Sequence, residues 1–246
     1  MRYMGGKMRL GKQLAGVIQT YNPKVYAEPF CGMFSVGKHL ACQHKVASDI
    51  HPDLILLLQA VQTGWKPPTN ITEEQYNGLR NSTPSALRGF VGFGCSFYGK
   101  FFGGFARDPS MNDFGTIARN NMLKLAPVIQ GVELLRRSYI DYEGDADVLY
   151  CDPPYEGTTD FSSGVFDTAQ FWDWVRDRQE IVLVSEYAAP KDFKAVWEKP
   201  ITTTMKDKTG RGCARVERLF QHKHPCTVPV FIPASGLPLA QCQPCL

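Results

Sequence analysis

The 246-residue sequence predicts an α/β protein with a doubly wound, mostly parallel sheet. Apolar runs at residues 147–151 and 181–185 are typical of strands that are covered on both faces, as in a parallel sheet. A third run, residues 25–28, leads through a glycine turn into a predicted helix. Strand, glycine turn and helix in this order form the nucleotide-binding unit of a doubly wound sheet.

The other regular elements follow in chain order. The predicted helices are residues 10–21, 37–41, 54–63 and 72–81. The further predicted strands are residues 46–49 and, at an edge of the sheet, 217–221. Asp49 ends the first of these two strands, and ligands of doubly wound folds bind outside the carboxyl ends of strands.

The alternation of strands and helices stops between residues 52 and 122. Glycine and aromatic residues dominate residues 89–107. We therefore expect an inserted, mainly helical lobe at 52–122 that contains a hairpin-like loop. Residues 1–51 and 123–223 are expected to form the surrounding domain, and the uncharged, proline-rich residues 224–246 a tail over its surface.

Composition sets few limits on function. The net charge of +3 permits a nucleic-acid partner without demanding one. The sequence has no apolar stretch of about 18 residues and no apolar core of a secretion signal near its start, so we expect a cytoplasmic protein without a membrane partner. In a reducing compartment the cysteines are expected to stay free, as small, half-buried apolar residues; those considered are Cys31, Cys42, Cys95 and Cys151.

The tetrad Asp152-Pro153-Pro154-Tyr155, which directly follows a predicted strand, indicates methylation of an exocyclic amino group. The lone pair of such an amine is delocalised into the ring. An Asp152 carboxylate and a Pro153 carbonyl that each accept one amino hydrogen would turn the lone pair toward a methyl donor. The two prolines fix the backbone, and Tyr155 offers a face on which a base can stack. The alternative is that the tetrad is only a turn that ends a strand.

Four separated motifs resemble, in order, those of the Dam-type DNA N6-adenine methyltransferases, a D-P-P-Y family of the alpha group often encoded by phages and prophages. The likeness spans residues 2–220. The motifs are Tyr3-Met4-Gly5-Gly6-Lys7, Glu28-Pro29-Phe30-Cys31-Gly32, Asp49 and the tetrad. The resemblance implies a Rossmann-like sheet of the class I methyltransferase type, S-adenosylmethionine as methyl donor, no metal, and double-stranded DNA as partner of a monomer or weak dimer.

The resemblance also implies the donor pocket. Tyr3 and Lys7 would touch the donor, the lysine by pairing with its carboxylate, although residues 3–7 could instead be a plain basic arm. Gly32 would let the backbone approach the methionine part, and Asp49 would accept the ribose hydroxyls unless it is a surface cap. The other implied donor contacts are Glu28, Phe30, Ile50, Tyr139, Asp141 and Asp152. Residues 33–35, Met-Phe-Ser, stand where the family often has a second glycine.

The inserted lobe lies where these enzymes carry their target-recognition domain. Basic side chains there could follow a phosphate backbone, although a packed aromatic core with glycine turns is the alternative. The candidate DNA contacts are Arg88, Lys100 and Arg107 and, in a basic glycine loop that could also be an ordinary hairpin turn, Lys208 and Arg211.

The zinc interpretation and the choice of function stay open. A zinc site is possible but disfavoured, since its candidate ligands contain a single C-x-x-C pair; they are His222, His224, Cys226, Cys242 and Cys245. The preferred function is site-specific transfer of a methyl group to a flipped-out adenine of DNA. The same donor pocket could serve RNA adenine, cytosine N4 or a glutamine side chain, although Asp152 argues against the last two. A fold that binds nucleic acid without turnover is the third possibility.

Overall fold

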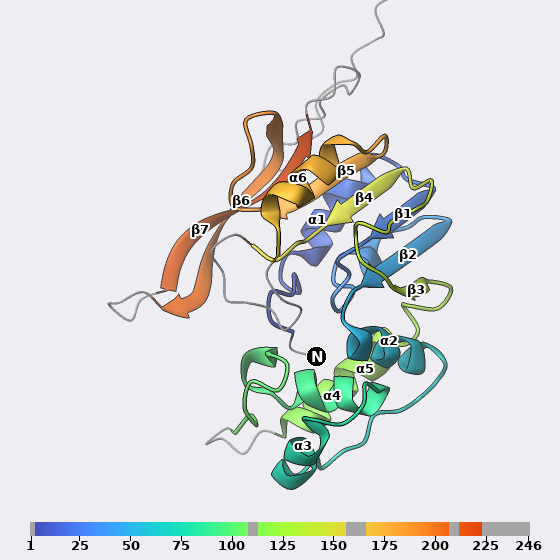
Figure 1. Cartoon of the computed structure of the whole chain (residues 1–246), viewed down its shortest axis with the longest axis vertical. Coiled ribbons are helices and arrows are strands. Elements are labelled where there is room, and N and C mark those ends of the chain that lie inside the picture. Colours follow the sequence, from blue (N-terminus) through green and yellow to red (C-terminus); the bar gives the residue numbers. More distant parts are fainter. Residues whose placement is uncertain (1–2, 108–112, 156–165, 207–211, 223–246) are drawn as a thin grey trace, which may run out of the picture.

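The computed structural model describes residues 3–107, 113–155, 166–206 and 212–222 (Figure 1). The strands of this part form one sheet in the order β3-β2-β1-β4-β5-β7-β6. Neighbouring strands are parallel except that β7 runs antiparallel to β5 and β6. The strands are β1 (Val25–Glu28), β2 (His44–Asp49), β3 (Glu133–Arg136), β4 (Val148–Cys151), β5 (Ile181–Glu186), β6 (Phe193–Lys206) and β7 (Gly212–His222). The expected doubly wound, mostly parallel sheet is confirmed.

The central strands are apolar because both of their faces are covered. All four residues of β4 are buried. Val148 and Tyr150 pack in one apolar cluster, with α1 (Gly11–Gln19), whereas Leu149 and Cys151 pack in a second one, with α6 (Thr168–Arg176). This alternation is the period-2 pattern of a strand between two layers.

The order of the strands reverses between β1 and β4, whose carboxyl ends therefore face a crevice without a crossover helix above it. Glu28 ends β1, and Asp152 directly follows β4. The fold thus brings the glycine turn and the tetrad to the same edge of the sheet.

The chain between β2 and β3 forms helices that extend away from the sheet (Figure 1). They are α2 (Pro52–Gln62), α3 (Glu73–Leu79), α4 (Ala86–Gly94) and α5 (Phe114–Leu125), with the short 3-10 helix η2 (Phe97–Gly99). A single antiparallel bridge, Ser96 with Phe105, closes the loop that contains η2. One apolar cluster runs from Val148 in the sheet to Tyr76 and Phe90 in these helices. The boundaries of the inserted lobe at residues 52 and 122 stay a prediction.

Two expectations about individual segments were wrong. Residues 217–221 do not form an edge strand, because β7 lies between β5 and β6 and β6 is the edge. Residues 89–94, expected to be part of a glycine-rich loop, belong to helix α4. Its glycines serve close packing: a Cβ on Gly89 would lie 2.2 Å from the Asp53 carbonyl oxygen, and one on Gly92 would lie 2.4 Å from the Phe101 ring. Glycine is the residue that permits such contact.

Candidate active site

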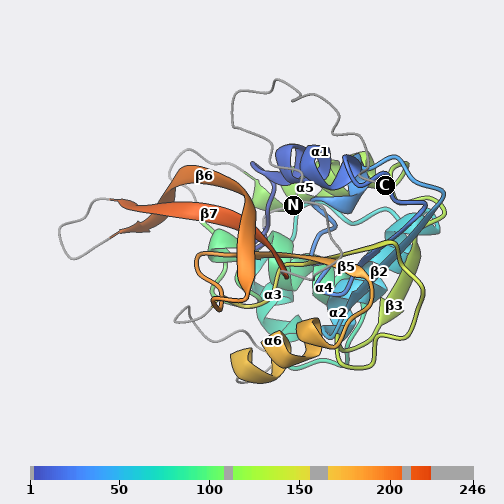
Figure 2. The same cartoon turned by 90° about the horizontal axis from the view of Figure 1, so that it is seen from above.

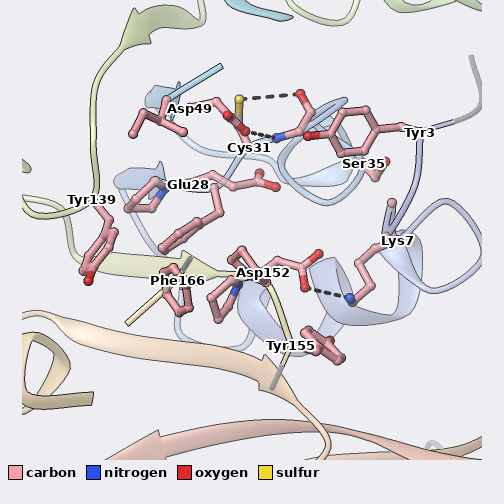
Figure 3. A pocket seen from close by; sticks show the side chains of 18 of the residues that line it. Tyr3, Lys7, Glu28, Cys31, Ser35, Asp49, Tyr139, Asp152, Tyr155 and Phe166 are labelled. Atoms are coloured by element: carbon pink, nitrogen blue, oxygen red, sulfur yellow. Dashed lines mark hydrogen bonds and ion pairs between the residues drawn. The ribbon is translucent and has the colours of Figure 1, made fainter. Parts of the chain in front are cut away.

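A cavity of about 460 Å³ lies at the carboxyl ends of β1, β2 and β4 (Figure 3). The segments that line it are far apart in the sequence: residues 3–7, 28–33, 49–50, 137–140 and 152–155, with Phe166 and Tyr187 among the others. Its volume is within the range of about 300–1,000 Å³ that small-molecule sites occupy. All four motifs identified in the sequence therefore contribute to one cavity.

Asp49 stands at the end of β2 with its carboxylate held by the backbone. Its Oδ2 accepts a hydrogen bond from the Gly32 amide at 3.1 Å, and Oδ1 accepts one from the His51 amide at 3.0 Å. Burial raises the pKa of Asp49 to about 6, against the lowering effect of these amides. Gly32 has φ +47°, and a Cβ there would lie 3.1 Å from the Tyr3 ring, so a larger residue would be strained at this position. An oriented carboxylate of this kind can accept hydrogen bonds from a diol.

Glu28 is 3% exposed and fastens the glycine turn. Its Oε2 accepts hydrogen bonds from the Tyr26 hydroxyl at 3.0 Å and from the Gly37 amide at 3.1 Å, and its Oε1 takes part in neither. Burial raises the pKa of Glu28 to about 8, although both hydrogen bonds counteract it. Glu28 is thus largely protonated near neutral pH, and its main effect is to hold the loop between β1 and Gly37.

Aromatic side chains form the wall next to Asp49 and Glu28 (Figure 3). The Phe30 and Tyr139 rings stack at 5.2 Å between centroids with an angle of 27° between their planes. Phe166 meets Phe30 edge-on at 5.9 Å. Such a wall accommodates a flat, purine-sized ring.

Lys7 connects the N-terminal motif to the tetrad. Its Nζ lies 2.6 Å from Asp152 Oδ1 and 3.5 Å from a carboxylate oxygen of Glu217 (Figure 3 draws the shorter contact). The ammonium also lies 4.4 Å from the centroid of the Tyr155 ring, and the Tyr155 hydroxyl donates a hydrogen bond to Glu217. The lysine thus contacts the tetrad and β7, whereas its pairing with a donor carboxylate remains a prediction.

This cluster places two buried carboxylates around one cation. Burial disfavours the charged form of Lys7, but Asp152 and Glu217 outweigh that effect and raise the Lys7 pKa, so the ammonium stays charged. Burial raises the pKa of Asp152, and the Lys7 ammonium counteracts the increase. Burial likewise raises the pKa of Glu217, opposed by Lys7 and reinforced by the charge of Asp152. The two acids therefore hold a proton more readily than exposed carboxylates do.

Glu217 and Tyr187 were not identified from the sequence. Glu217 is the sixth residue of β7 and 2% exposed, and a single acidic residue inside a predicted strand carries no specific signal. Tyr187 directly follows β5 and packs edge-on against Tyr155 at 4.7 Å. Its place at the carboxyl end of a strand beside the tetrad was a usable signal.

Of the remaining residues predicted to contact the donor, some line the cavity and one does not. Tyr3, Ile50 and Tyr139 line the cavity, and Ile50 keeps half of its side chain exposed. Asp141 is exposed and is not among the residues that line the cavity, and its contact with a methyl donor stays a prediction.

Arg88 is held by partners within the lobe, and its contact with DNA stays a prediction. Its guanidinium lies 2.5 Å from Oδ2 of Asp53, a residue that is 1% exposed, and donates to the carbonyls of Leu79 and Arg80. These bonds fasten α4 to α2 and to the end of α3.

The other basic candidates are on the outside of the lobe or beyond the described residues. Arg107 is exposed and pairs with Glu73 at 2.6 Å. Lys100 is exposed and follows Phe97 and Tyr98, whose side chains are 57% and 59% exposed. Lys208 and Arg211 lie outside the described residues.

Within the described ranges no group of three or more potential metal ligands occurs, and of the zinc candidates only His222 belongs to those ranges. Among the same residues no helix has the length and apolar character needed to cross a membrane. Cys31, Cys95 and Cys151 are buried and Cys42 is half-buried, all as free thiols.

Comparison with known proteins gives one sequence match and several distant structural ones. Residues 3–83 match the family model of the D12 class N6 adenine-specific DNA methyltransferases, a stretch that holds the first three motifs and ends before the tetrad. No curated protein matches the chain.

Three of the similar solved structures are remote in sequence and in structure. A candidate RNA methyltransferase from Pyrococcus horikoshii is 9% identical with a TM-score of 0.42, over 87% of this chain and 83% of that one. The ribosomal protein L11 methylase of Lactobacillus delbrueckii is 12% identical with a TM-score of 0.37, over 89% and 79%. The 23S rRNA methyltransferase ErmE is 10% identical with a TM-score of 0.38, over 88% and 70%. The fold assignment therefore depends on the strand order and the strand directions, which are those of a Rossmann-like doubly wound sheet. The chain has this doubly wound fold, and its N-terminal third resembles the D12 class of N6 adenine-specific DNA methyltransferases.

Proposed function

We propose that this protein transfers a methyl group from S-adenosylmethionine to N6 of an adenine in DNA. One observation carries the proposal: a single cavity joins the Asp49 carboxylate and the aromatic wall to the tetrad at the end of β4. A two-substrate methyl transfer needs a donor site and an acceptor site side by side, with the reacting atoms in line. The match of residues 3–83 to the D12 class supports adenine in DNA as the substrate.

The donor half of the cavity fits the chemical groups of S-adenosylmethionine. Asp49, held by two backbone amides, suits the ribose hydroxyls, and the stacked Phe30 and Tyr139 suit the adenine ring. The bound donor supplies a methyl group on a positively charged sulfur, and no metal is needed for its transfer. The buried carboxylate of Asp152 provides negative charge in the same cavity.

In the acceptor half, the tetrad would bind and activate the amino group. Asp152 and the Pro153 carbonyl each accept one N6 hydrogen, which turns the nitrogen lone pair away from the ring. The new C–N bond forms as the bond between the methyl carbon and the donor sulfur breaks, which leaves an uncharged thioether as the leaving group, and the nitrogen loses a proton. Asp152 and Glu217 share one ammonium and offer an acceptor for that proton. Tyr155, fixed by Glu217, presents its ring to the base.

The target base must leave the duplex to reach this site. An adenine that is stacked inside a helix cannot enter a cavity walled by Tyr155, Phe166 and the glycine turn. We therefore include base flipping in the proposal, at a cost of a few kcal/mol of unstacking.

The test combines labelling with product identification. The full chain is incubated with tritiated S-adenosylmethionine and adenine-containing duplexes of varied sequence, and the nucleosides are analysed by mass spectrometry. We expect N6-methyladenine in DNA with the parent protein and none with Asp152→Ala, while both bind the donor in calorimetry. Product on cytosine or only on RNA would reassign the substrate, and donor binding without any labelled nucleic acid would refute the proposal.

A further inference from the structure

A second hollow lies directly beside the active-site cavity, against the hairpin of β6 and β7. Its volume is about 600 Å³. The residues that line this hairpin groove are Tyr187, Pro200, Ile201, Ala214, Arg215, Val216 and Arg218. Tyr187 also lines the active-site cavity. A ligand that is too long for the active-site cavity would therefore extend over Tyr187 into the hairpin groove.

The strand register explains why the groove is at this edge. The last residue of β5, Glu186, pairs with Arg218 of β7. Residues 212–217 of β7 and their partners on β6 therefore extend past the carboxyl end of β5, at the edge where the cavity opens. Figures 1 and 2 show this hairpin projecting beyond the rest of the sheet.

A row of side chains connects the tetrad to the hairpin groove. Tyr187 packs edge-on against Tyr155 at 4.7 Å, and the Arg215 guanidinium lies 4.6 Å from the centroid of the Tyr187 ring. Arg218 holds Tyr187 in place, since it donates to the Tyr187 carbonyl at 2.6 Å and pairs with Glu198 at 3.3 Å. Arg215 itself is exposed and can reach a ligand.

We propose that the hairpin groove binds the nucleotide next to the target base on the same strand, with Arg215 on its phosphate and Tyr187 against its sugar or base. The inference rests on the proposed function, because it assumes a nucleic-acid substrate. Among the described lining residues there is no carboxylate, and the exposed Arg215 guanidinium complements a phosphate, whereas Arg218 is engaged by Glu198 and the Tyr187 carbonyl. The remaining apolar lining, Pro200, Ile201 and Val216, suits the uncharged part of a nucleotide.

The experiment compares Arg215→Ala with a matched control, Lys24→Ala. Lys24 is an exposed cation just before the amino end of β1, whereas the cavity lies at the carboxyl ends of the strands. Binding of a fluorescein-labelled adenine-containing 20-base-pair duplex is measured by anisotropy between 50 and 200 mM NaCl, and donor binding by calorimetry. For Arg215→Ala we expect affinity about 10-fold weaker at the low salt and a salt slope smaller by about one, with donor affinity unchanged. Lys24→Ala should behave as the parent does.

Each outcome separates this inference from the proposed function. If the parent methylates the duplex and Arg215→Ala binds and methylates it equally well, the hairpin groove is not a nucleotide site and the proposed function stands. If Arg215→Ala and Lys24→Ala weaken binding alike, the effect is general electrostatics and the site assignment is wrong. If the parent binds the donor but binds and methylates no nucleic acid, both proposals fall.

Discussion

The Lys7 ammonium lies 2.6 Å from Asp152 Oδ1, across 145 positions of sequence, and so joins the N-terminal motif to the tetrad. The contact is buried, with 9% of the lysine and 15% of the aspartate side chain exposed. The lysine therefore influences the charge state of Asp152, in the proposed acceptor site, as well as the position of its carboxylate.

Replacing Lys7 by Met should destabilise the fold in a pH-dependent way. The variant leaves Asp152 and Glu217 close together without their cation, and removal of one partner of a buried ion pair costs about 3–5 kcal/mol. The pKa of both acids should rise further, so the deficit is largest above neutral pH and shrinks as the pH falls and the acids take up protons. Urea unfolding at pH 5 and pH 8 measures this difference. An equal deficit at both pH values would contradict it, and Lys7→Arg serves as the charge-conserving control.

Glu217 should act on the reaction through the Tyr155 hydroxyl. Glu217→Ala and Tyr155→Phe each remove one side of that hydrogen bond and should lower kcat about 10- to 100-fold by releasing the ring from its position. Because they disrupt the same contact, the double variant should lose little more than either single one. Methyl-transfer kinetics of the three variants test the cycle, and fully additive losses would show that the two residues act separately.

Donor affinity should decline as the pH falls through about 6. Asp49 has its pKa raised to about 6 by burial, so its carboxylate is ionised above that pH and progressively protonated below it. If only the ionised form accepts the ribose hydroxyls, the dissociation constant rises about tenfold per pH unit well below the pKa. Calorimetric titration of S-adenosylmethionine from pH 5 to pH 8 measures this, and Asp49→Asn should bind weakly with no such dependence. A flat profile for the parent protein would assign the ribose contact to another group.

Arg88 and Lys100 should show opposite phenotypes. Arg88→Ala leaves the buried Asp53 without its guanidinium and should cost about 2–4 kcal/mol of unfolding free energy. Lys100→Ala should change stability by less than about 0.5 kcal/mol and instead weaken duplex binding, since Lys100 is exposed beside Phe97 and Tyr98. Urea unfolding and anisotropy on both variants decide between the roles, and a stable Arg88→Ala protein with weak DNA binding would support the prediction from sequence that Arg88 contacts DNA.

The sequence predicted the centre of the sheet better than its margins. β4 and β5 are recognisable because burial on both faces requires continuous apolar residues. β6 was missed because an edge strand tolerates charges and the proline at position 200. α4 was missed because Gly89 and Gly92 suggest a loop, although they are there for close packing against Asp53 and Phe101.

The residues of the candidate site also differ in how well the sequence predicted them. Asp49 and the tetrad were identified because each lies at the carboxyl end of a strand, where ligands of doubly wound sheets bind. The connection of Lys7 to Asp152 and Glu217 depends on how β4 and β7 are placed around the N-terminal segment. Spacing along the chain holds no information about that placement.

The burial of β4 on both faces also limits how its sequence can change. Val148 and Tyr150 belong to one apolar cluster and Leu149 and Cys151 to the other, while the Tyr150 hydroxyl bonds Ser185 on the neighbouring strand. An insertion or deletion of one residue within the strand would exchange the two sets and turn the residue after it toward the opposite layer. The number of residues in β4 thus fixes Asp152 on the side of Lys7. We expect the proposed activity to tolerate insertions or deletions near the tetrad only outside β4.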